Sequence, residues 1–467
     1  MPRKRVKIVS IGAGSFFCRG TIADLIGSPE AKELACELVL VDTDAAALER
    51  MYRYALLVKE HYRSDIAITM TTDRREALPD ADYVITSVAI HRYPLWEQDF
   101  RLPLAHGFKH CLGENGGPGA AFHALRNYEL MVPICRDMEA LCPDALLLNY
   151  TNPESRIIRA VTDLTKIRSV GLCHGIFGSL EGAAHILGKK GDELDFISGG
   201  LNHFFWVTKL SDKKTGKDLY PELRRRILAN PPGPDAPPLV KKMVEVFGLY
   251  TYPSDDHIGE YLSFATEFTG LKWHYGREVR PVAAQEKATE EHWLDAYVSG
   301  EKPLDERALS RSGELAVPIA LAIELDRPYQ AAAVNVPNTE GYVAELPREA
   351  VVEVPALVDG KGIRPQRIGP LPEGLAAFCR TQCSIQKLLV EAYRERSKNL
   401  LLQTLLLDPV VDSVGNAERL MEDMLELQKE YLPTFTEGGG ASYFPLRALC
   451  VSAVRPSPVA SARRGVL

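Results

Sequence analysis

The sequence lacks long apolar runs and lacks an excess of positive charge. No apolar stretch approaches the ~20 residues that a helix needs to cross a bilayer. The 62 Asp and Glu residues outnumber the 55 Lys and Arg residues, giving a net charge of −7. A general nucleic-acid binder needs a basic face that neutralises phosphates, so this balance argues against that class. We therefore expect a soluble protein with neither a membrane nor a nucleic acid as partner.

Paired-cysteine motifs are also missing. The nine cysteines are odd in number and contain no tandem CxxC, which argues against a disulfide framework and a zinc knuckle. We expect mostly reduced, buried thiols in the cytoplasm, with Cys379 and Cys383 packed on one helical face. The basic and then apolar start, MPRKRVKIVSIGAGS, runs into a glycine loop without a small-residue cleavage site. We interpret it as a first core strand and not as a signal peptide.

The order of apolar and helical segments predicts the fold class. Through residues 1–200, short apolar runs alternate with helical stretches, which is typical of an α/β, Rossmann-like, doubly wound parallel sheet. Residues 201–467 predict a mixed α+β domain for substrate, metal and oligomerisation. The expected strands are 6–11, 36–44, 81–89, 144–152, 167–175, 329–338 and 349–360, and the expected helices are 19–28, 45–59, 378–406 and 417–431.

A glycine loop after the first strand predicts a nucleotide site. Gly12 and Gly14 stand between strand and helix, where glycine lets the backbone approach a pyrophosphate. Asp42 closes the second strand, where a carboxylate can accept hydrogen bonds from a ribose and favour NAD over NADP. Phe17 replaces the third glycine of the GxGxxG pattern. The structural alternative is a tight turn with a surface aspartate.

Two polar loops are candidates for binding a sugar. In NYTNPES (149–155), Pro153 forces Asn152 out of helical geometry, and neutral amide groups there suit hydroxyls. The alternative is an Asx-type turn before a helix. In CLGENGGPGA (111–120), Glu114 and Asn115 lie in a glycine-rich loop that either approaches a ligand closely or is simply mobile.

Cysteine and histidine stand at two further strand ends. Cys173 lies in GLCHGIFG and His203 in GGLNHFFWV, and a thiolate with an imidazole suits borderline divalent metals. Their spacing of thirty residues is not diagnostic, so core packing is the alternative. In SDDHIGEYLSF (254–264), a helix would put His257 and Tyr261 on one face, although an acidic helix start also explains the aspartates.

Taken in order, these motifs resemble those of glycoside hydrolase family 4. The resemblance runs from KIVSIGAGS through GENGGPG, NYTNPES, GLCHG and GLNHFFW to NVPNTEGYVAELP (335–347) and LLLDPVV (405–411). It implies a glycosidase that depends on NAD and on Mn²⁺, Co²⁺ or another divalent metal. The implied reaction is oxidation at C3 by NAD, loss of the C2 proton, elimination of the aglycone, addition of water and re-reduction.

The resemblance also implies roles for individual residues. Cys173 and His203 match the metal ligands, and Asn152 matches a sugar-binding asparagine. It also implies that NAD is bound by four residues: Gly12, Gly14, Ser15 and Asp42. It further implies a homodimer or homotetramer acting on a small carbohydrate.

Departures from the family pattern suggest the substrate. Trp96 stands where the 6-phospho-glycosidases carry a phosphate-binding arginine, so we expect an unphosphorylated sugar. His257 stands at the position of the tyrosine that serves as C2 base in that branch, and a metal-bound hydroxide or Tyr261 is the alternative base. The CHG sequence resembles the α-glucuronidase type, in which His174 would protonate the leaving oxygen, contact the uronate or only orient Cys173.

The sequence thus predicts an α-glucuronidase that cleaves uronic-acid glycosides. Within the family, the alternatives are an α-galacturonidase, an α-glucosidase and an α-galactosidase. Outside it, a 2-hydroxy acid dehydrogenase would need no metal and would give net NADH. A non-enzymatic nucleotide sensor would tolerate loss of Cys173 and His203.

Overall fold

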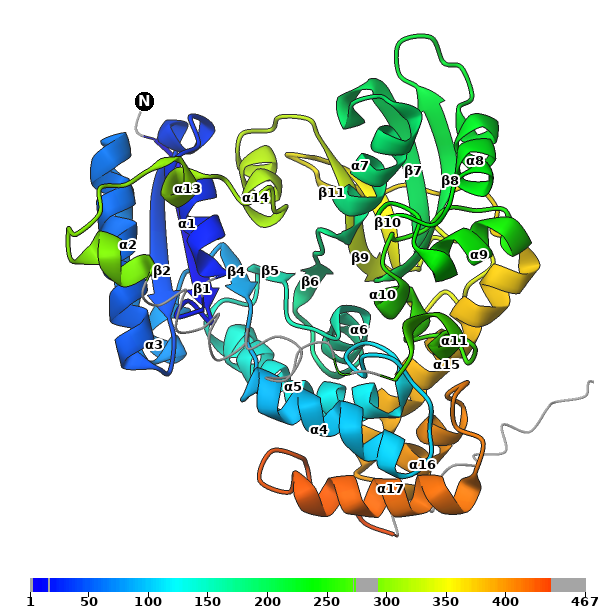
Figure 1. Ribbon diagram of the computed structural model, residues 1–467. Helices are drawn as coiled ribbons and strands as arrows, with labels where there is room; N and C mark the ends of the chain where they lie inside the picture. The colour runs from blue at the N-terminus through cyan, green and yellow to red at the C-terminus, as the bar shows by residue number, and fades with distance from the viewer. Residues whose placement is uncertain (1–2, 16, 272, 274–292, 438–467) are drawn as a thin grey trace, which may run out of the picture.

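One mixed sheet runs through the molecule (Figure 1). The computed structural model describes residues 3–15, 17–271, 273 and 293–437. Within these residues the sheet has eleven strands in the order β3-β2-β1-β4-β5-β6-β9-β10-β7-β8, with β11 paired to β10. The strands are β1 (Arg5–Ile11), β2 (Ala35–Val41), β3 (Ala67–Thr71), β4 (Tyr83–Thr86), β5 (Leu146–Asn149), β6 (Arg168–Gly171), β7 (Leu194–Leu201), β8 (Phe204–Asp212), β9 (Tyr329–Pro337), β10 (Val351–Asp359) and β11 (Gly362–Pro365).

The first six strands form a parallel sheet, as predicted, although β3 was not among the expected strands. Successive residues of β1 point to opposite faces, and both faces are buried: Ile8 belongs to one hydrophobic cluster and Val9 to another. Helices α1 (Cys18–Ile26) and α2 (Ala45–Tyr62) cover the first face, and α5 (Gly117–Leu141) and α6 (Glu154–Leu164) cover the second. This arrangement confirms the Rossmann-like α/β class.

Beyond β6 the sheet continues with antiparallel strands. The two later strands were predicted from sequence and appear as β9 and β10, whereas the β7–β8 hairpin was not predicted. Gly171 pairs with Asn335 to join β6 to β9. Strands from both sides of residue 200 therefore share one sheet, and the division into domains at that residue stays a prediction.

The helices after residue 200 differ from the prediction in several places, and the helix expected over 417–431 is α17 (Val414–Leu427). The long helix expected over 378–406 is broken into α15 (Glu373–Glu395) and α16 (Lys398–Leu406). Arg396 adopts a left-handed φ of 53°, and Ser397 caps the new helix by accepting a hydrogen bond from the Leu400 N–H. Cys379 and Cys383 are both buried in α15, as predicted.

The remaining helices surround the sheet. Figure 1 shows α5, α6, α15 and α16 below it and α7, α8 and α9 beside the β7–β8 hairpin. Among the described residues, none of the helices combines the length and the apolar character needed to span a bilayer. The other helices are α3 (Arg74–Ala77), α4 (Arg92–Ala105), α7 (Gly175–Leu187), α8 (Tyr220–Ala229), α9 (Pro238–Phe247), α10 (Asp255–Gly259), α11 (Thr266–Thr269), α13 (Glu306–Leu309), α14 (Ala316–Glu324) and α17 (Val414–Leu427).

Candidate active site

The glycine loop after β1 has the geometry of a nucleotide-binding turn. Gly12 has φ +89°, and a Cβ there would lie 2.1 Å from the Ser87 carbonyl oxygen, so only glycine fits. The N–H groups of Gly12 and Ala13 both donate to the Val41 carbonyl, at 2.9 and 3.0 Å. These bonds hold the loop at the carboxyl end of β1, the edge where parallel sheets bind ligands.

Asp42 stabilises this loop from the end of β2. Its carboxylate accepts hydrogen bonds from the Gly14 N–H at 2.8 Å and from the Asp44 N–H at 2.9 Å. The aspartate is thus part of the turn as well as a candidate ribose ligand. Each carboxylate oxygen can accept more than one bond, so the half-buried Asp42 keeps free acceptor capacity for a hydroxyl.

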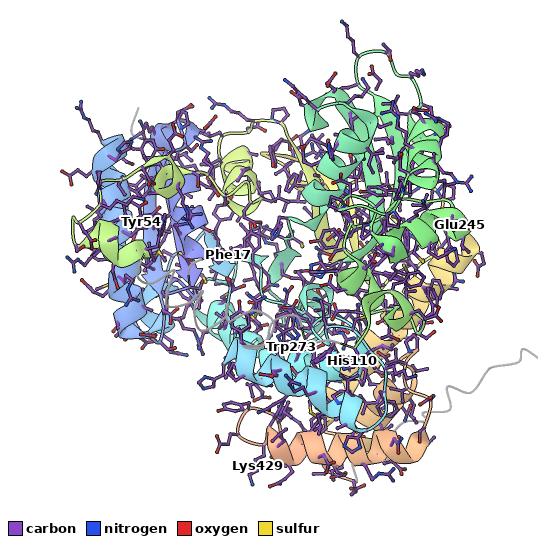
Figure 2. The ribbon with its side chains drawn as sticks, in the orientation of Figure 1. Phe17, Tyr54, His110, Glu245, Trp273 and Lys429 are labelled. Atoms are coloured by element: carbon purple, nitrogen blue, oxygen red, sulfur yellow. The ribbon has the colours of Figure 1, made fainter. Side chains whose placement is uncertain are left out.

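One side-chain hydroxyl at the start of α1 is left without a partner among the described residues. The Ser15 hydroxyl is buried without a hydrogen-bond partner, and Phe17 precedes the helix without any side-chain cap. The Cys18 and Gly20 N–H groups donate to the carbonyls of Ser15 and Phe17, at 3.1 and 3.2 Å. The positive end of the helix dipole favours a phosphate. The ring centroid of Phe17, which Figure 2 labels, lies 4.8 Å from the ring centroid of Tyr150. This contact links the glycine loop to the NYTNPES motif. These features fit a dinucleotide.

The predicted metal ligands meet. Cys173 follows β6 by two residues, and His203 lies in the turn between β7 and β8. The Cys173 Sγ is 3.4 Å from the His203 Nε2. His203 has a left-handed φ of 64°, which is uncommon for a residue with a side chain and points to a turn that its surroundings hold in place.

The ionisation of this pair suits a divalent cation. Burial lowers the pKa of His203 to about 3, so its imidazole is neutral and can ligate. Burial also raises the pKa of Cys173 to about 12, and a bound metal would deprotonate such a thiol. Over the described ranges, no group of three or more His, Cys, Asp and Glu side chains is placed to hold a metal. Within the described residues, Cys173 and His203 are therefore the candidate ligands as a pair, without a third side chain of these types beside them.

The predicted sugar-binding residues also lie together. The Asn152 Nδ2 is 3.4 Å from the Glu114 Oε1, and the Asn115 Nδ2 is 3.4 Å from the Glu114 Oε2. Arg92 donates to the Glu114 Oε1 at 3.2 Å. The Asn152 carbonyl accepts from the Asn127 side chain, which fixes the turn before α6. Amide and carboxylate groups arranged in this way can bind hydroxyls.

Glu260 holds the Glu114 loop, a role that the sequence did not reveal. Its Oε1 accepts hydrogen bonds from the N–H groups of Glu114 at 2.6 Å and Asn115 at 2.9 Å. Its other oxygen is buried without a partner. Burial, together with the charge of Glu114, raises the pKa of Glu260 to about 8.

We expect Glu260 to make stability depend on pH. Its carboxyl keeps a proton in the folded chain up to about pH 8 but loses it near pH 4.5 when unfolded, so raising the pH between these values weakens folding. Glu260→Gln should therefore gain stability relative to the wild type by up to ~1.4 kcal/mol for each pH unit in this window. Denaturant unfolding from pH 5 to 9 measures the difference. Glu267→Gln, at an exposed residue, is the control, and equal slopes in all three proteins would contradict the prediction.

His257 lies beside His203 of the Cys173–His203 pair. Its ring centroid is 5.0 Å from that of His203, and its Nδ1 is 2.9 Å from the Asp256 Oδ1. Burial opposes a charge on this imidazole, but the Asp256 carboxylate outweighs it and raises the pKa of His257. With Nδ1 held by Asp256, the imidazole can exchange a proton through Nε2.

Tyr261 is placed differently from the sequence-based expectation. Helix α10 ends at Gly259, so Tyr261 does not share a helical face with His257. Its hydroxyl donates to the Asn202 carbonyl at 3.2 Å, and its ring stacks on Phe204. This tyrosine supports the turn that carries His203.

His174 is the most exposed member of the group. Its side chain is 69% exposed, and its Nδ1 is 3.0 Å from the Glu314 Oε1. The hydrogen bond to Glu314 raises the pKa of His174. Glu314 lies 140 residues further along the chain, and no sequence signal pointed to it.

Trp96, expected from the family resemblance to stand in place of a phosphate-binding arginine, lies in α4. It is buried, and its indole N–H donates to the Leu112 carbonyl at 2.8 Å. Its ring packs edge-on against Trp273, which Figure 2 labels near His110. Trp96 therefore contacts the start of the Glu114 loop, and the Arg92 guanidinium lies over its ring at 5.6 Å from the ring centroid.

The family models and known relatives agree on one family. Residues 7–189 match the model of the family 4 glycosyl hydrolases, and residues 198–411 match the model of their C-terminal domain. The α-glucosidase of Erwinia rhapontici is 32% identical, covering 91% of this chain and 98% of the relative. The α-galactosidase of Bacillus subtilis (strain 168) is 30% identical, covering 92% and 99%.

Two solved structures share the fold. A 6-phospho-α-glucosidase from gut microorganisms, in complex with NAD and Mn²⁺, superposes with a TM-score of 0.80 at 23% identity, covering 93% of this chain and all of the other. The 6-phospho-β-glucosidase of Thermotoga maritima, with manganese, NAD⁺ and glucose-6-phosphate, has a TM-score of 0.77 at 22% identity, covering 92% and 100%. From the model matches and the relatives, this chain belongs to family 4 of the glycosyl hydrolases.

Proposed function

We propose that this chain is an NAD- and Mn²⁺-dependent α-glycosidase that acts on an unphosphorylated hexoside in the cytoplasm. The observation that carries the proposal is the Cys173–His203 pair, 3.4 Å apart, at the same sheet edge as the glycine loop. The neutral imidazole, the unpartnered Ser15 hydroxyl and the uncapped start of α1 support both cofactors. The proposed site needs a free thiol, which a reducing compartment maintains.

The chain's own residues would divide the work. Cys173 and His203 would hold the metal, and Glu114, Asn115 and Asn152 would bind sugar hydroxyls. His257, as an imidazole made more basic by Asp256, would take the proton from C2. His174, held through Nδ1 by Glu314, would give a proton to the leaving glycosidic oxygen. When bound, NAD supplies reversible hydride transfer and Mn²⁺ polarises the sugar oxygens.

The sugar is the finer part of the proposal. The relatives named α-glucosidase and α-galactosidase support a neutral α-hexoside, and the apolar Trp96 supports the absence of a phosphate. An α-glucuronide is the second candidate, favoured by the exposed imidazole of His174, which can meet a carboxylate. A dimer or tetramer stays a prediction.

We expect release of the aglycone from an aryl α-glucoside or α-galactoside only when NAD⁺, Mn²⁺ and a thiol reductant are all present. The panel also contains the α-glucuronide, the α-galacturonide and the 6-phospho-α-glucoside. Faster cleavage of a uronide would replace the first candidate by the second. Preference for the 6-phospho-glucoside would contradict the proposal of an unphosphorylated substrate. Cleavage without NAD⁺ or without metal would refute the proposed mechanism.

A further inference from the structure

Few backbone pairings connect the two turns that carry Cys173 and His203. Strand β6, which leads to Cys173, pairs with β9 only at Gly171 and Asn335. Strand β7, which leads to His203, pairs with β10 only at Gly200 and Glu353. By contrast, β9 and β10 share a long ladder. Something other than backbone hydrogen bonding must therefore fix the position of one turn relative to the other.

The Glu353 side chain lies at this junction. It is 2% exposed, and its Oε2 accepts hydrogen bonds from the Asn202 Nδ2 at 2.8 Å and the Asn335 Nδ2 at 3.2 Å. Asn202 directly precedes His203. The Asn335 Nδ2 also lies 3.4 Å from the carbonyl of Gly171, two residues before Cys173. One carboxylate oxygen thus connects both turns.

We propose that Glu353 is a positioning residue for the metal pair: through Asn202 and Asn335 it sets how Cys173 and His203 face each other. The inference rests on the proposed metal site and extends it. Nothing in the proposed chemistry uses Glu353 directly. It acts by restraining the two turns, in the way that residues behind metal ligands orient them.

Burying the polar side chains of this junction costs folding free energy, which suggests that they have a positioning role. The second oxygen of Glu353 and the side-chain oxygens of Asn202 and Asn335 are buried without partners. Apolar residues would fill the space between strands without unsatisfied groups, and each such group costs free energy. Hydrogen bonds to a carboxylate are directional, whereas apolar contacts are not. They can therefore fix the orientation of the turn in which His203 has its left-handed conformation.

A second carboxylate, that of Glu154, lies against β6. A Cβ at Gly171 would lie 1.6 Å from the Glu154 Oε1, so β6 passes directly against that side chain. Glu154 is itself held by the Asn149 Nδ2 at 3.1 Å. Gly171 at the end of β6 therefore lies against both Glu154 and Asn335, and Cys173 follows from a restrained position.

The test measures metal binding by the full-length chain without any turnover. Glu353→Leu removes the acceptor, and Glu353→Gln keeps an oxygen that can accept from both asparagines. Val352→Ala, at a buried neighbour in β10, controls for general loosening of the strand. The readouts are Mn²⁺ affinity by calorimetry and the sulfur-to-cobalt charge-transfer band of the Co²⁺ form, which reports the Cys173 ligand.

We expect Glu353→Leu to weaken Mn²⁺ binding by about 10–100-fold and to shift or abolish the cobalt band. Glu353→Gln should stay close to the wild type, and Val352→Ala should lower thermal stability alone. If Glu353→Leu does not fold, Asn335→Ala should give the same loss of affinity, because it cuts the link to Gly171.

Wild-type affinity and an unchanged band in both Glu353→Leu and Asn335→Ala would overturn the inference. An equal loss in Val352→Ala would overturn it too, since the effect would then be general loosening. A wild-type chain without a thiolate–cobalt band would overturn the proposed metal site and the inference together. A normal band without glycosidase activity would refute the proposed function and leave the role of Glu353 standing.

Discussion

Cys173→Ser is expected to lower metal-dependent glycoside cleavage by about 10³-fold, because polarisation by a metal is worth several kcal/mol and each ~1.4 kcal/mol is a factor of ten in rate. The hydroxyl of serine is a far weaker ligand than a thiolate for a borderline divalent ion. The neutral imidazole of His203, 3.4 Å from the thiol, would then be the one protein ligand left of the pair. Initial rates of aryl glycoside cleavage against Mn²⁺ concentration measure the effect.

A second cysteine provides the control for this substitution. Cys142 is buried at the end of α5, outside the group of site residues, and Cys142→Ser removes a thiol without touching the proposed metal. We expect it to keep metal-stimulated activity. If Cys173→Ser retained that stimulation, Cys173 would not be a ligand, and the proposed mechanism would lose its metal site.

Gly12→Ala is expected to weaken NAD binding by about 10–100-fold, since a strained backbone conformation costs roughly 1–3 kcal/mol. The new Cβ would lie 2.1 Å from the Ser87 carbonyl oxygen, and φ +89° disfavours any side chain. The loop must shift, and with it the groups that would bind the pyrophosphate. Titration of NAD⁺ by calorimetry gives the affinity, and cleavage should fall in parallel.

Gly233→Ala is the matched substitution for this experiment. No atom lies within 4 Å of a Cβ at Gly233, and its φ is not in the left-handed range. We expect wild-type NAD⁺ affinity and activity from it. Equal NAD⁺ affinity in Gly12→Ala and the wild type would show that the loop after β1 is not where the nucleotide binds.

Local features of the fold were predictable from sequence. The apolar strand β1, the glycine turn and the start of α1 follow from short-range patterns: buried β-branched residues, a required positive φ and a helix start. The candidates Cys173, His203, Asn152 and Glu114 could be named because their residue types suit metals and hydroxyls. The structure brings each of these pairs to within 3.4 Å.

Long-range contacts were not predictable. Glu314 reaches His174 across 140 residues, Glu260 reaches Glu114 across 146, and Glu353 reaches Asn202 across 151. A single sequence carries no periodic signal for such pairs. The break between α15 and α16 was missed for a related reason: apolar periodicity continues through it, while the left-handed Arg396 interrupts the backbone.

The narrow junctions on either side of β9 and β10 also bear on cooperativity. Native proteins open in units that are internally well bonded and weakly bonded to each other. We expect the single residue pair at each junction to be where such units separate, with the parallel strands on one side and the β7–β8 hairpin on the other, although one hydrophobic cluster packs across both junctions. A ligand that bridges Cys173 and His203 would tie two units together, so its binding would slow amide hydrogen exchange far beyond the residues that it touches.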